Sequence, residues 1–345
     1  MPMLDHTAYP DIIDHVLDSC SLSTLAAFRA ASRAFRDNVD RRLLVHAELE
    51  AVEVPDDYSI SGARTEYAFV IARDARYPAF VPTKSPPVRI KGHLPWKPAY
   101  VHTLDLDFHD WVESTSLPDA LLSGLSTLHT LRRFNDRRWR RTLSRPESAW
   151  IPARTVVDFV RVPRNRKSRN STITDSLAIM LPPKVRRYIL HLHWDAVYPS
   201  PHYTRLRLDN GDKLREVVLA LKPTVRREWQ PDQQYRSVPA FLTSALRIAF
   251  EVIKRGGTLT IVGAEMVHPL QLGGNADDEF DPRSYLSIWL AKQVIREAWA
   301  TGPDPRPYEQ VQTRIRVIRM VEWWKELGYE RKIIEGRWPY ADNES

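Results

Sequence analysis

Apolar positions in the first 50 residues recur at the spacing of α-helices. Pro10 and Asp11 stand where a first helical turn tolerates a proline and favours a negative charge. Ile13, Val16 and Leu17 follow at helical spacing and form one apolar stripe. The pattern therefore predicts a helix that begins at about Pro10.

Two further short helices are predicted before residue 50. Ser21 or Ser23 can cap the second helix, in which Leu25 and Phe28 share a face. A third begins near Ser32 and has an apolar residue at every fourth position: Phe35, Val39, Leu43 and Ala47. Because three helices of this size cannot enclose a full core, we expect an apolar face to remain for a partner.

From Tyr100 onward, short strand-like runs alternate with helix-like ones. Strands are predicted at residues 103–108, 155–162, 187–194, 215–222 and 258–263, and helices at residues 119–134, 174–181 and 239–255. This alternation predicts an α/β fold with a mainly parallel sheet and helical crossovers. The strand spacing is too uneven for a regular leucine-rich repeat of about 20–29 residues, so an irregular repeat arc and an open sheet both remain.

Two of the predicted strands have one apolar and one polar face. A strand covered on both sides should be apolar on both faces, so we expect the polar faces to be partly solvated. They are the candidate target-facing residues: Asp105, Asp107 and the following His109 in one strand, and His191, His193 and Asp195 in the other. Residues 217–221, in contrast, are apolar on both faces and indicate a central strand.

Prolines divide the chain into regions. Their density between Pro78 and Pro98 opposes a helix or a central strand and favours an extended connection. We therefore expect a helical head at 1–50, a helical extension with a proline-rich linker at 51–99, and an α/β domain at 100–345. Near the end, an amphipathic helix is predicted from one stripe: Val311, Ile315, Ile318, Val321, Trp324 and Leu327.

The N-terminal pattern resembles the F-box family at two places. The family's opening Leu-Pro and two apolar residues at four-residue steps correspond here to Tyr9-Pro10, Ile13 and Leu17. Its later signature corresponds to Leu25, Phe28, Ala31-Ser32-Arg33 and Phe35-Arg36. The chain departs from the family with Tyr9 for Leu, Ile12 where an acid is usual, Ala31 for Val and Phe35 for Trp. The alternative reading is an ordinary N-terminal helical hairpin.

The resemblance implies a substrate-recognition subunit of a Skp–cullin–F-box ubiquitin ligase. Such a subunit joins the Skp adaptor, and through it a cullin, to a target protein, and it is not itself an enzyme. The residues expected to contact the adaptor are Pro10, Ile13, Leu17, Leu22, Leu25, Phe28 and Phe35. Residues 102–106, 215–219 and 258–263 also resemble strands of fungal F-box proteins, which implies a target-binding domain. The sequence does not name the target.

The positive charge of the chain suggests a different function. The formal net charge is +7, and much of it lies in two clusters: Arg132, Arg133, Arg137, Arg138, Arg140, Arg141 and Arg145 in one, and Arg161, Arg164, Arg166, Lys167 and Arg169 in the other. Such clusters can neutralise phosphates, so the alternative is a ligase-independent nucleic-acid- or chromatin-associated protein. However, no zinc-finger spacing or RNA-recognition signature accompanies them.

The remaining composition favours an intracellular protein in the cytoplasm, the nucleus or both. Cys20 is the single cysteine, which suits a reducing compartment, and no apolar run is long enough to predict a membrane partner. His191, His193 and Asp195 have spacing that could bind a metal, but a polar strand face produces the same pattern. No phosphate loop, dinucleotide fingerprint or nucleophile elbow is present, so we expect no catalytic, cofactor or metal site.

Overall fold

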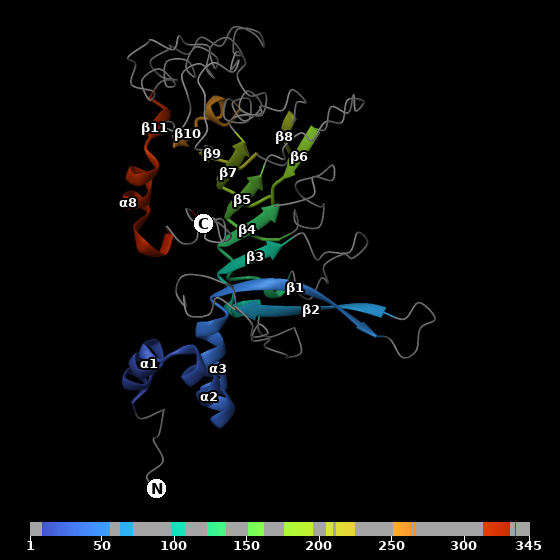
Figure 1. The fold of residues 1–345 in the computed structure, drawn as a ribbon, viewed down its shortest axis with the longest axis vertical. Helices are drawn as coiled ribbons and strands as arrows, with labels where there is room; N and C mark the ends of the chain where they lie inside the picture. The colour runs from blue at the N-terminus through green and yellow to red at the C-terminus, as the bar shows by residue number, and fades with distance from the viewer. Residues whose placement is uncertain are drawn as a thin grey trace.

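A computed structural model describes residues 9–55, 63–71, 98–107, 123–135, 151–161, 176–195, 205–209, 212–224, 251–263, 265, 313–331 and 335. Within residues 9–55, the chain forms α1 (Pro10–Ser19), α2 (Leu22–Ala31) and α3 (Arg33–Leu43), which together make a helical head at one end of a large sheet (Figure 1). These helices lie where the apolar spacing predicted them, except that α3 ends at Leu43 and Ala47, the last residue of the predicted third stripe, lies in a strand.

The helices of the head begin at the residues that the sequence favours for this role. Pro10 occupies the first turn of α1 with Asp11 beside it. The hydroxyl of Ser21 accepts a hydrogen bond from the backbone N–H of Thr24, and that of Ser32 accepts one from the N–H of Phe35. Both hydroxyls satisfy a backbone donor that a helix start otherwise leaves without a partner.

The main sheet of the described chain has nine strands in the order β11-β10-β9-β7-β5-β4-β3-β1-β2. The strands are β1 (His46–Pro55), β2 (Ala63–Ile71), β3 (Thr103–Asp107), β4 (Thr130–Asn135), β5 (Thr155–Arg161), β7 (Arg187–Asp195), β9 (Glu216–Thr224), β10 (Thr258–Val262) and β11 (Ile315–Ile318). Eight of them run parallel, and β2 pairs antiparallel with β1 at one edge. The predicted α/β class and mainly parallel sheet are confirmed.

The order of the parallel strands follows the chain without reversal across the described residues. A doubly wound sheet reverses its order at a switch point, whereas this sheet adds each new strand beside the preceding one. Strands β6 (Ser176–Met180) and β8 (Arg205–Asp209) pair in a second parallel sheet, so the chain alternates between two sheets from β5 to β9.

Two predicted helices are wrong over at least part of their length. Residues 123 and 124 of the first are helical, but residues 130–134 lie in β4, and residues 176–180 of the second form β6. Leu125, Leu128 and Leu131 are three residues apart, which imitates a helical stripe, and residues 176–180 are a short apolar run that periodicity cannot assign. Pairing with neighbouring strands decided both cases. The five predicted strands are confirmed as β3, β5, β7, β9 and β10, whereas β1, β2, β8 and β11 were not predicted.

The predicted helical extension at 51–99 is also wrong where the chain is described, because β1 continues to Pro55 and β2 occupies Ala63–Ile71. Since β1 pairs with both β2 and β3, the sheet begins within the region assigned to the head. The proline-rich residues 78–95 lie outside the described residues. The head and the sheet therefore meet at His46 rather than across a linker.

The C-terminal stripe is not one helix. Ile315 and Ile318 lie in β11, and α8 (Met320–Arg331) begins two residues later. In α8 the buried residues are Trp323 and Leu327, whereas Val321 and Trp324 are exposed. The prediction extended one helical period across a strand, so within α8 it identified Leu327 as buried but named Trp324 in place of Trp323. Val311 lies outside the described residues.

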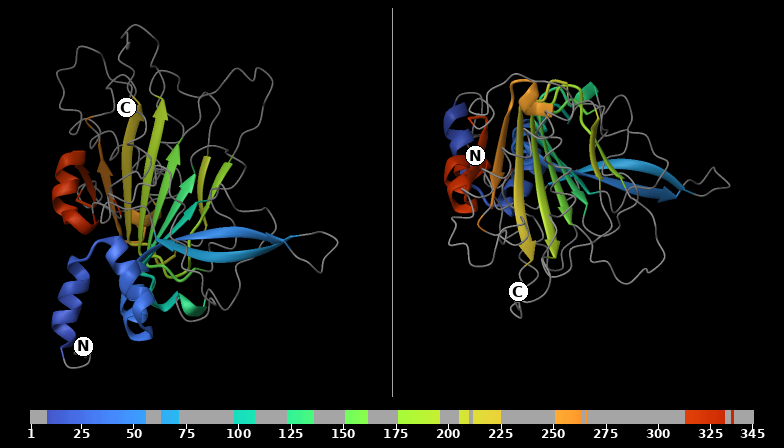
Figure 2. Two further views of the ribbon diagram at one scale, coloured as in Figure 1. Left: turned by 60° about the horizontal axis from the view of Figure 1, so that its bottom comes forward. Right: turned by 90° about the horizontal axis from the view of Figure 1, so that it is seen from above.

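The two faces of the main sheet differ in what covers them. One face, here called the apolar face, is lined by Leu104, Val156, Leu190, Leu219 and Ile261, all fully buried. The other, here called the α8 face, has a core in which Trp323 and Leu327 of α8 pack with side chains such as Val157, Phe159 and Val218. Figures 1 and 2 show α8 on one side of the main sheet and the β6–β8 pair on the other.

Arg133, Asp158 and Tyr188 form a charged cluster within the apolar face. Arg133 donates two hydrogen bonds to Asp158, of 2.5 and 2.7 Å, and the Tyr188 hydroxyl donates a third, of 2.8 Å. Burial and the adjacent carboxylate raise the pKa of Tyr188 well above 10, which keeps the hydroxyl protonated as a donor. The cluster ties β4, β5 and β7 together across the sheet.

We expect Asp158→Ala to destabilise the protein by about 3–5 kcal/mol, because it leaves a buried guanidinium without its counter-ion. Replacing both charges with apolar residues, as Arg133→Met with Asp158→Leu, should restore much of this loss. Denaturant unfolding monitored by circular dichroism measures both. A single variant as stable as the wild type would show that the pair does not hold these strands.

Gly328 gives the second stability prediction. Its φ of 69° and ψ of 178° interrupt α8 in a region of backbone space that is almost restricted to glycine. Gly328→Ala should therefore cost about 1–3 kcal/mol in unfolding free energy. Lys325→Ala, at an exposed position of the same element, is the control and should change stability by less than about 0.5 kcal/mol. Equal effects of the two substitutions would contradict the prediction.

Candidate docking and target-binding surfaces

The head buries several of the residues predicted to contact an adaptor. Ile13, Leu17 and Leu25 are 7%, 1% and 1% exposed, respectively, and lie among the head's buried apolar residues with Val39 and Leu43. These three side chains therefore pack within this chain and expose little surface, and their role in adaptor contact stays a prediction. Pro10 is exposed, Phe28 and Phe35 are half-buried with ring centroids 5.3 Å apart, and the side chain of Leu22 lies outside the described residues.

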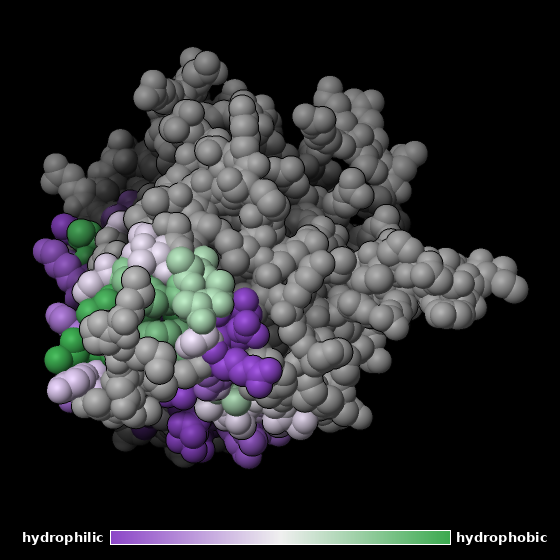
Figure 3. All heavy atoms as spheres, turned by 90° about the horizontal axis from the view of Figure 1, so that it is seen from below, coloured by the Kyte–Doolittle hydropathy of each residue, from purple (hydrophilic) through white to green (hydrophobic). Residues whose placement is uncertain are grey.

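A different set of apolar residues of the head faces solvent. Tyr9, Ile12 and Val16 are 60%, 59% and 43% exposed, and their spacing places them on one side of α1. We call them the α1 strip. Figure 3, seen from the head's end of the molecule, shows apolar surface bordered by hydrophilic side chains. A strip of large apolar residues on one helix is the kind of surface that binds a partner.

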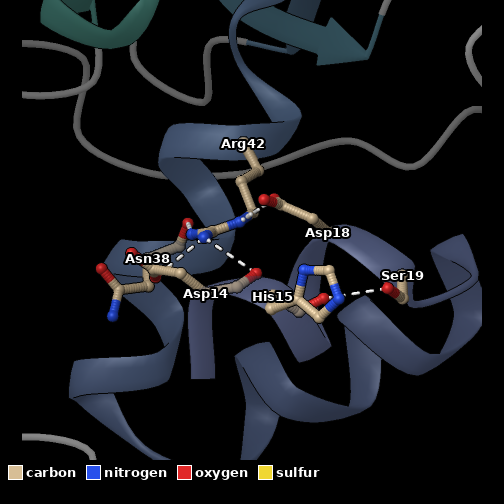
Figure 4. A network of polar contacts seen from close by, with 6 residues as sticks. All are labelled: Asp14, His15, Asp18, Ser19, Asn38 and Arg42. Carbon is tan, nitrogen blue, oxygen red and sulfur yellow. Dashed lines mark hydrogen bonds and ion pairs between the residues drawn. The ribbon is translucent and has the colours of Figure 1, made fainter. Parts of the chain in front are cut away.

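Charges hold α1 in this orientation (Figure 4). The guanidinium of Arg42 in α3 donates to the carboxylates of Asp14 and Asp18 in α1, both at 2.8 Å, and to the carbonyl of Asn38. The hydrogen bonds and charges of the two aspartates outweigh desolvation and raise the pKa of Arg42. Helical spacing puts Asp14 and Asp18 on the flank of α1 opposite Ile12 and Val16, so this anchor turns the α1 strip outward.

The head is also fixed to the sheet. The short 3₁₀ turn η2 (Pro98–Tyr100) precedes β3, and the hydroxyl of Tyr100 donates to Asp37 of α3 at 2.8 Å. The guanidinium of Arg41 lies 5.6 Å from the centre of the Tyr100 ring, which is the distance of a cation–π contact. Since α3 also continues into β1, two connections set the angle between head and sheet.

A row of polar side chains is buried on the α8 face at β1, β3 and β4. Nε2 of His46 lies 2.9 Å from Oδ1 of Asp105 and 3.0 Å from a guanidinium nitrogen of Arg132, which is itself 3.4 Å from Oδ2 of Asp105. One ring nitrogen cannot donate to the carboxylate and accept from the guanidinium at once. The charged acceptor favours the arrangement in which His46 donates to Asp105 and Arg132 pairs with the second carboxylate oxygen.

Asp105 was predicted to face solvent, but it is only 6% exposed. Asp105 can occupy a buried position in β3 because His46 and Arg132 pair with its carboxylate, so solvation by water is not required. Arg132 in turn lies over the rings of Phe134 and Phe159, at 5.1 and 5.4 Å from their centres. The side chain of Asp107 and all of His109 lie outside the described residues.

His191 is buried as well, which corrects its predicted exposure. It is 5% exposed, its ring stacks on Phe159 with centroids 4.6 Å apart, and Trp323 of α8 lies 5.8 Å away. Burial is the main cause that lowers the pKa of His191 from 6.5 to about 4. The hydrogen bond to Glu335 opposes this lowering, and the charges of Arg132 and Lys222 add to it. The neutral ring therefore donates from Nε2 to the carbonyl oxygen of Glu335, 2.5 Å away.

Glu335 also reaches the first residue of β7. A carboxylate oxygen of Glu335 lies 3.0 Å from a terminal nitrogen of Arg187, and a second terminal nitrogen of Arg187 donates to Glu216 of β9 at 3.1 Å. Glu335 is 5% exposed, so its charge is buried with this partner. One residue near the C-terminus thus contacts β7 at two points, through its backbone at His191 and its side chain at Arg187.

The arginines of the basic clusters whose side chains are described are buried rather than exposed. Arg132 and Arg133 are 3% and 1% exposed and are engaged with Asp105 and Asp158, so neither forms a phosphate-binding surface. The side chain of Arg161 and residues 137–145 and 164–169 lie outside the described residues, as do the side chains of His193 and Asp195. Among the described residues, no three His, Cys, Asp or Glu side chains gather as metal ligands.

The sequence did not single out His46, Arg187 or Glu335. Each lies at or beyond the end of a predicted element, where pattern carries little information about burial. One sequence signal could have found such residues. A charged residue in an otherwise apolar strand predicts that an oppositely charged residue lies nearby, because a buried charge needs a partner.

Comparison of the chain with models of known protein families, with curated proteins and with solved structures found no match. Among the described residues, none of the helices has the length and apolar character needed to cross a membrane.

The neutral state of buried His191 predicts a pH dependence. Between pH 6.5 and 4 the unfolded chain binds a proton at this residue and the folded chain does not, so stability falls as the pH falls. At about 1.4 kcal/mol per pH unit, the loss reaches about 3 kcal/mol at pH 4. Unfolding free energies of the wild type and of His191→Gln, which keeps an N–H donor without the titration, should therefore converge with acid. Parallel pH profiles would show that His191 titrates normally.

Proposed function

We propose that this protein is an F-box-like substrate receptor of a Skp–cullin–F-box ubiquitin ligase. Its head binds the Skp adaptor, and its sheet domain holds a target protein. The single observation that carries the proposal is the α1 strip: a three-helix head presents Tyr9, Ile12 and Val16 to solvent while Ile13 and Leu17 are buried. The resemblance of residues 9–36 to the F-box pattern gives the partner's class.

The mechanism of such a receptor is proximity. The adaptor and cullin bring the ubiquitin-charged enzyme, the sheet domain holds the target, and the receptor raises their effective concentration without a covalent step of its own. This requires a fixed geometry between the two binding surfaces. The contact of Tyr100 with Asp37 and Arg41, together with the direct continuation of α3 into β1, supports that requirement.

The alternative, a ligase-independent nucleic-acid- or chromatin-associated function, has no support in the described residues. The two cluster arginines whose side chains are described, Arg132 and Arg133, are buried and paired with carboxylates.

Adaptor binding can be tested with matched valine substitutions. Val16→Asp on α1 and Val321→Asp on α8 make the same change at two exposed helical positions, 43% and 51% exposed. We expect Val16→Asp to weaken binding to the Skp adaptor by roughly 30-fold, as for an interface anchor worth about 2 kcal/mol, and Val321→Asp to leave it unchanged. Adding Ile12→Asp to Val16→Asp should abolish co-elution with the adaptor in size-exclusion chromatography.

The control for folding is the thermal unfolding curve, which should be the same for the two valine variants because both side chains point to solvent. A folded wild-type protein that does not bind the adaptor would refute the proposal. Equal loss of binding in the two variants would place the adaptor elsewhere than on the α1 strip.

A further inference from the structure

A row of basic side chains lies along the edge of the main sheet at which its parallel strands begin. In five neighbouring strands, β3, β4, β5, β7 and β9, the residue just before the strand is exposed and is a histidine or an arginine: His102, His129, Arg154, Arg186 and Arg215. We call these five residues the edge row. The row begins beside Val45, just after α3, so it lies at the end of the sheet next to the head (Figure 2, left).

Backbone hydrogen bonds align the edge row from strand to strand. The N–H groups of Arg186 and Arg187 both donate to the carbonyl of Arg154, and those of Arg215 and Glu216 both donate to the carbonyl of Arg186. The same pattern links the other neighbours in the row. The residues of the row are therefore in register, one strand apart, at intervals of about 4.8 Å.

The three arginines of the row keep their positive charge uncompensated within the described part of the chain. Arg215 donates to the backbone carbonyl of Arg255 at 3.1 Å, which orients the guanidinium without cancelling its charge. No described residue forms an ion pair with Arg154 or Arg186. The row thus presents three adjacent cations to solvent.

The segments beside the edge row add to this charge. Residues 182–187, 212–216 and 251–258 contribute further exposed cations: Lys184, Lys213, Lys254 and Arg255. The acidic residues of these segments are Asp212, Glu216 and Glu251. Asp212 pairs with Arg255, and Glu216 pairs with Arg187. The surroundings therefore strengthen the positive potential of the row rather than neutralise it.

An alignment of like charges is unfavourable by itself. Equal charges at directly opposite positions of neighbouring strands destabilise a sheet, and Arg154, Arg186 and Arg215 occupy three such positions in succession. All three are exposed, so packing does not require arginine there. Proteins break a local rule of this kind mainly where a function uses the result. An anionic partner would convert the repulsion into attraction.

The geometry of the row fits neighbouring carboxylates of a polypeptide. A guanidinium binds a carboxylate through two parallel hydrogen bonds. The three arginines span two strand intervals, roughly 10 Å, which about three residues of extended chain cover. Among the described residues, the large apolar side chains that are exposed belong to α1, its N-cap and α8, so nucleic-acid bases would find no ring to stack on along the row.

We propose that the edge row binds an acidic segment of a partner protein, in which neighbouring glutamates or aspartates pair with Arg154, Arg186 and Arg215. The role of this segment as part of a ubiquitination target rests on the proposed function. In that role, the row holds the target beside the head that recruits the ligase. The binding test uses no adaptor, so the two proposals can fail separately.

The experiment measures binding of a fluorescein-labelled hexaglutamate peptide to the full chain by fluorescence anisotropy at low ionic strength, with hexaglutamine as the uncharged probe. Arg154→Gln combined with Arg186→Gln should weaken hexaglutamate binding by about tenfold or more, because two charge-assisted contacts are lost. Arg33→Gln combined with Arg36→Gln removes the same charge from exposed positions of α3 and should change the affinity by less than about twofold.

Thermal unfolding is the control for folding. Since Arg154 and Arg186 are exposed and next to like charges, their replacement should leave the unfolding temperature unchanged or raise it. The proposal is overturned if hexaglutamate does not bind, if hexaglutamine binds equally well, or if the two double variants weaken binding to the same extent. Tighter binding of a single-stranded or duplex oligonucleotide of the same charge, lost in the Arg154 and Arg186 variant, would also overturn it and assign the row to nucleic acid.

Discussion

Arg133 and Asp158 stand directly opposite each other in the register of β4 and β5, with both side chains in the dry apolar face of the sheet. A slip of one residue would move Asp158 to the other face and leave the guanidinium buried without a counter-ion. Tyr188 extends the same constraint to β7. A buried pair of this kind adds little net stability. Any other register would raise the free energy of the fold by burying an unpaired charge, so the pair fixes how three central strands align.

The same register determines the contents of the α8 face. With Arg133 opposite Asp158, the alternation of the strands puts Arg132 beside Asp105 and Phe159 beside His191. Arg132 then lies over two aromatic rings, and His191 lies between Phe159 and Trp323. The polar residues of this face are buried because α8 and Glu335 pack over them, and each finds a partner that offsets the loss of water.

The head follows a different principle. Its helices are short, and α1 contacts its neighbours through Ile13 and Leu17 and through Arg42 on one flank. The opposite flank, the α1 strip, has no comparable cover among the described residues. Capping by Ser21 and Ser32 stabilises the ends of α2 and α3, but a head of this size cannot also bury a second apolar side. An exposed strip is therefore a consequence of the length of the head as well as a suitable surface for a partner.

The sequence by itself determined the elements whose signals are local: the head helices with their caps, and five strands identified by their apolar runs. It also determined the α/β class, because strands separated by crossovers favour parallel pairing. Tertiary structure alone decided that residues 130–135 pair as β4, that the chain adds strands in order, and that Asp105 and His191 are buried. Alternation shows which residues share a face but not what covers that face. Here the cover comes from α8 and Glu335, more than 120 residues later in the chain than the strand they meet at His191.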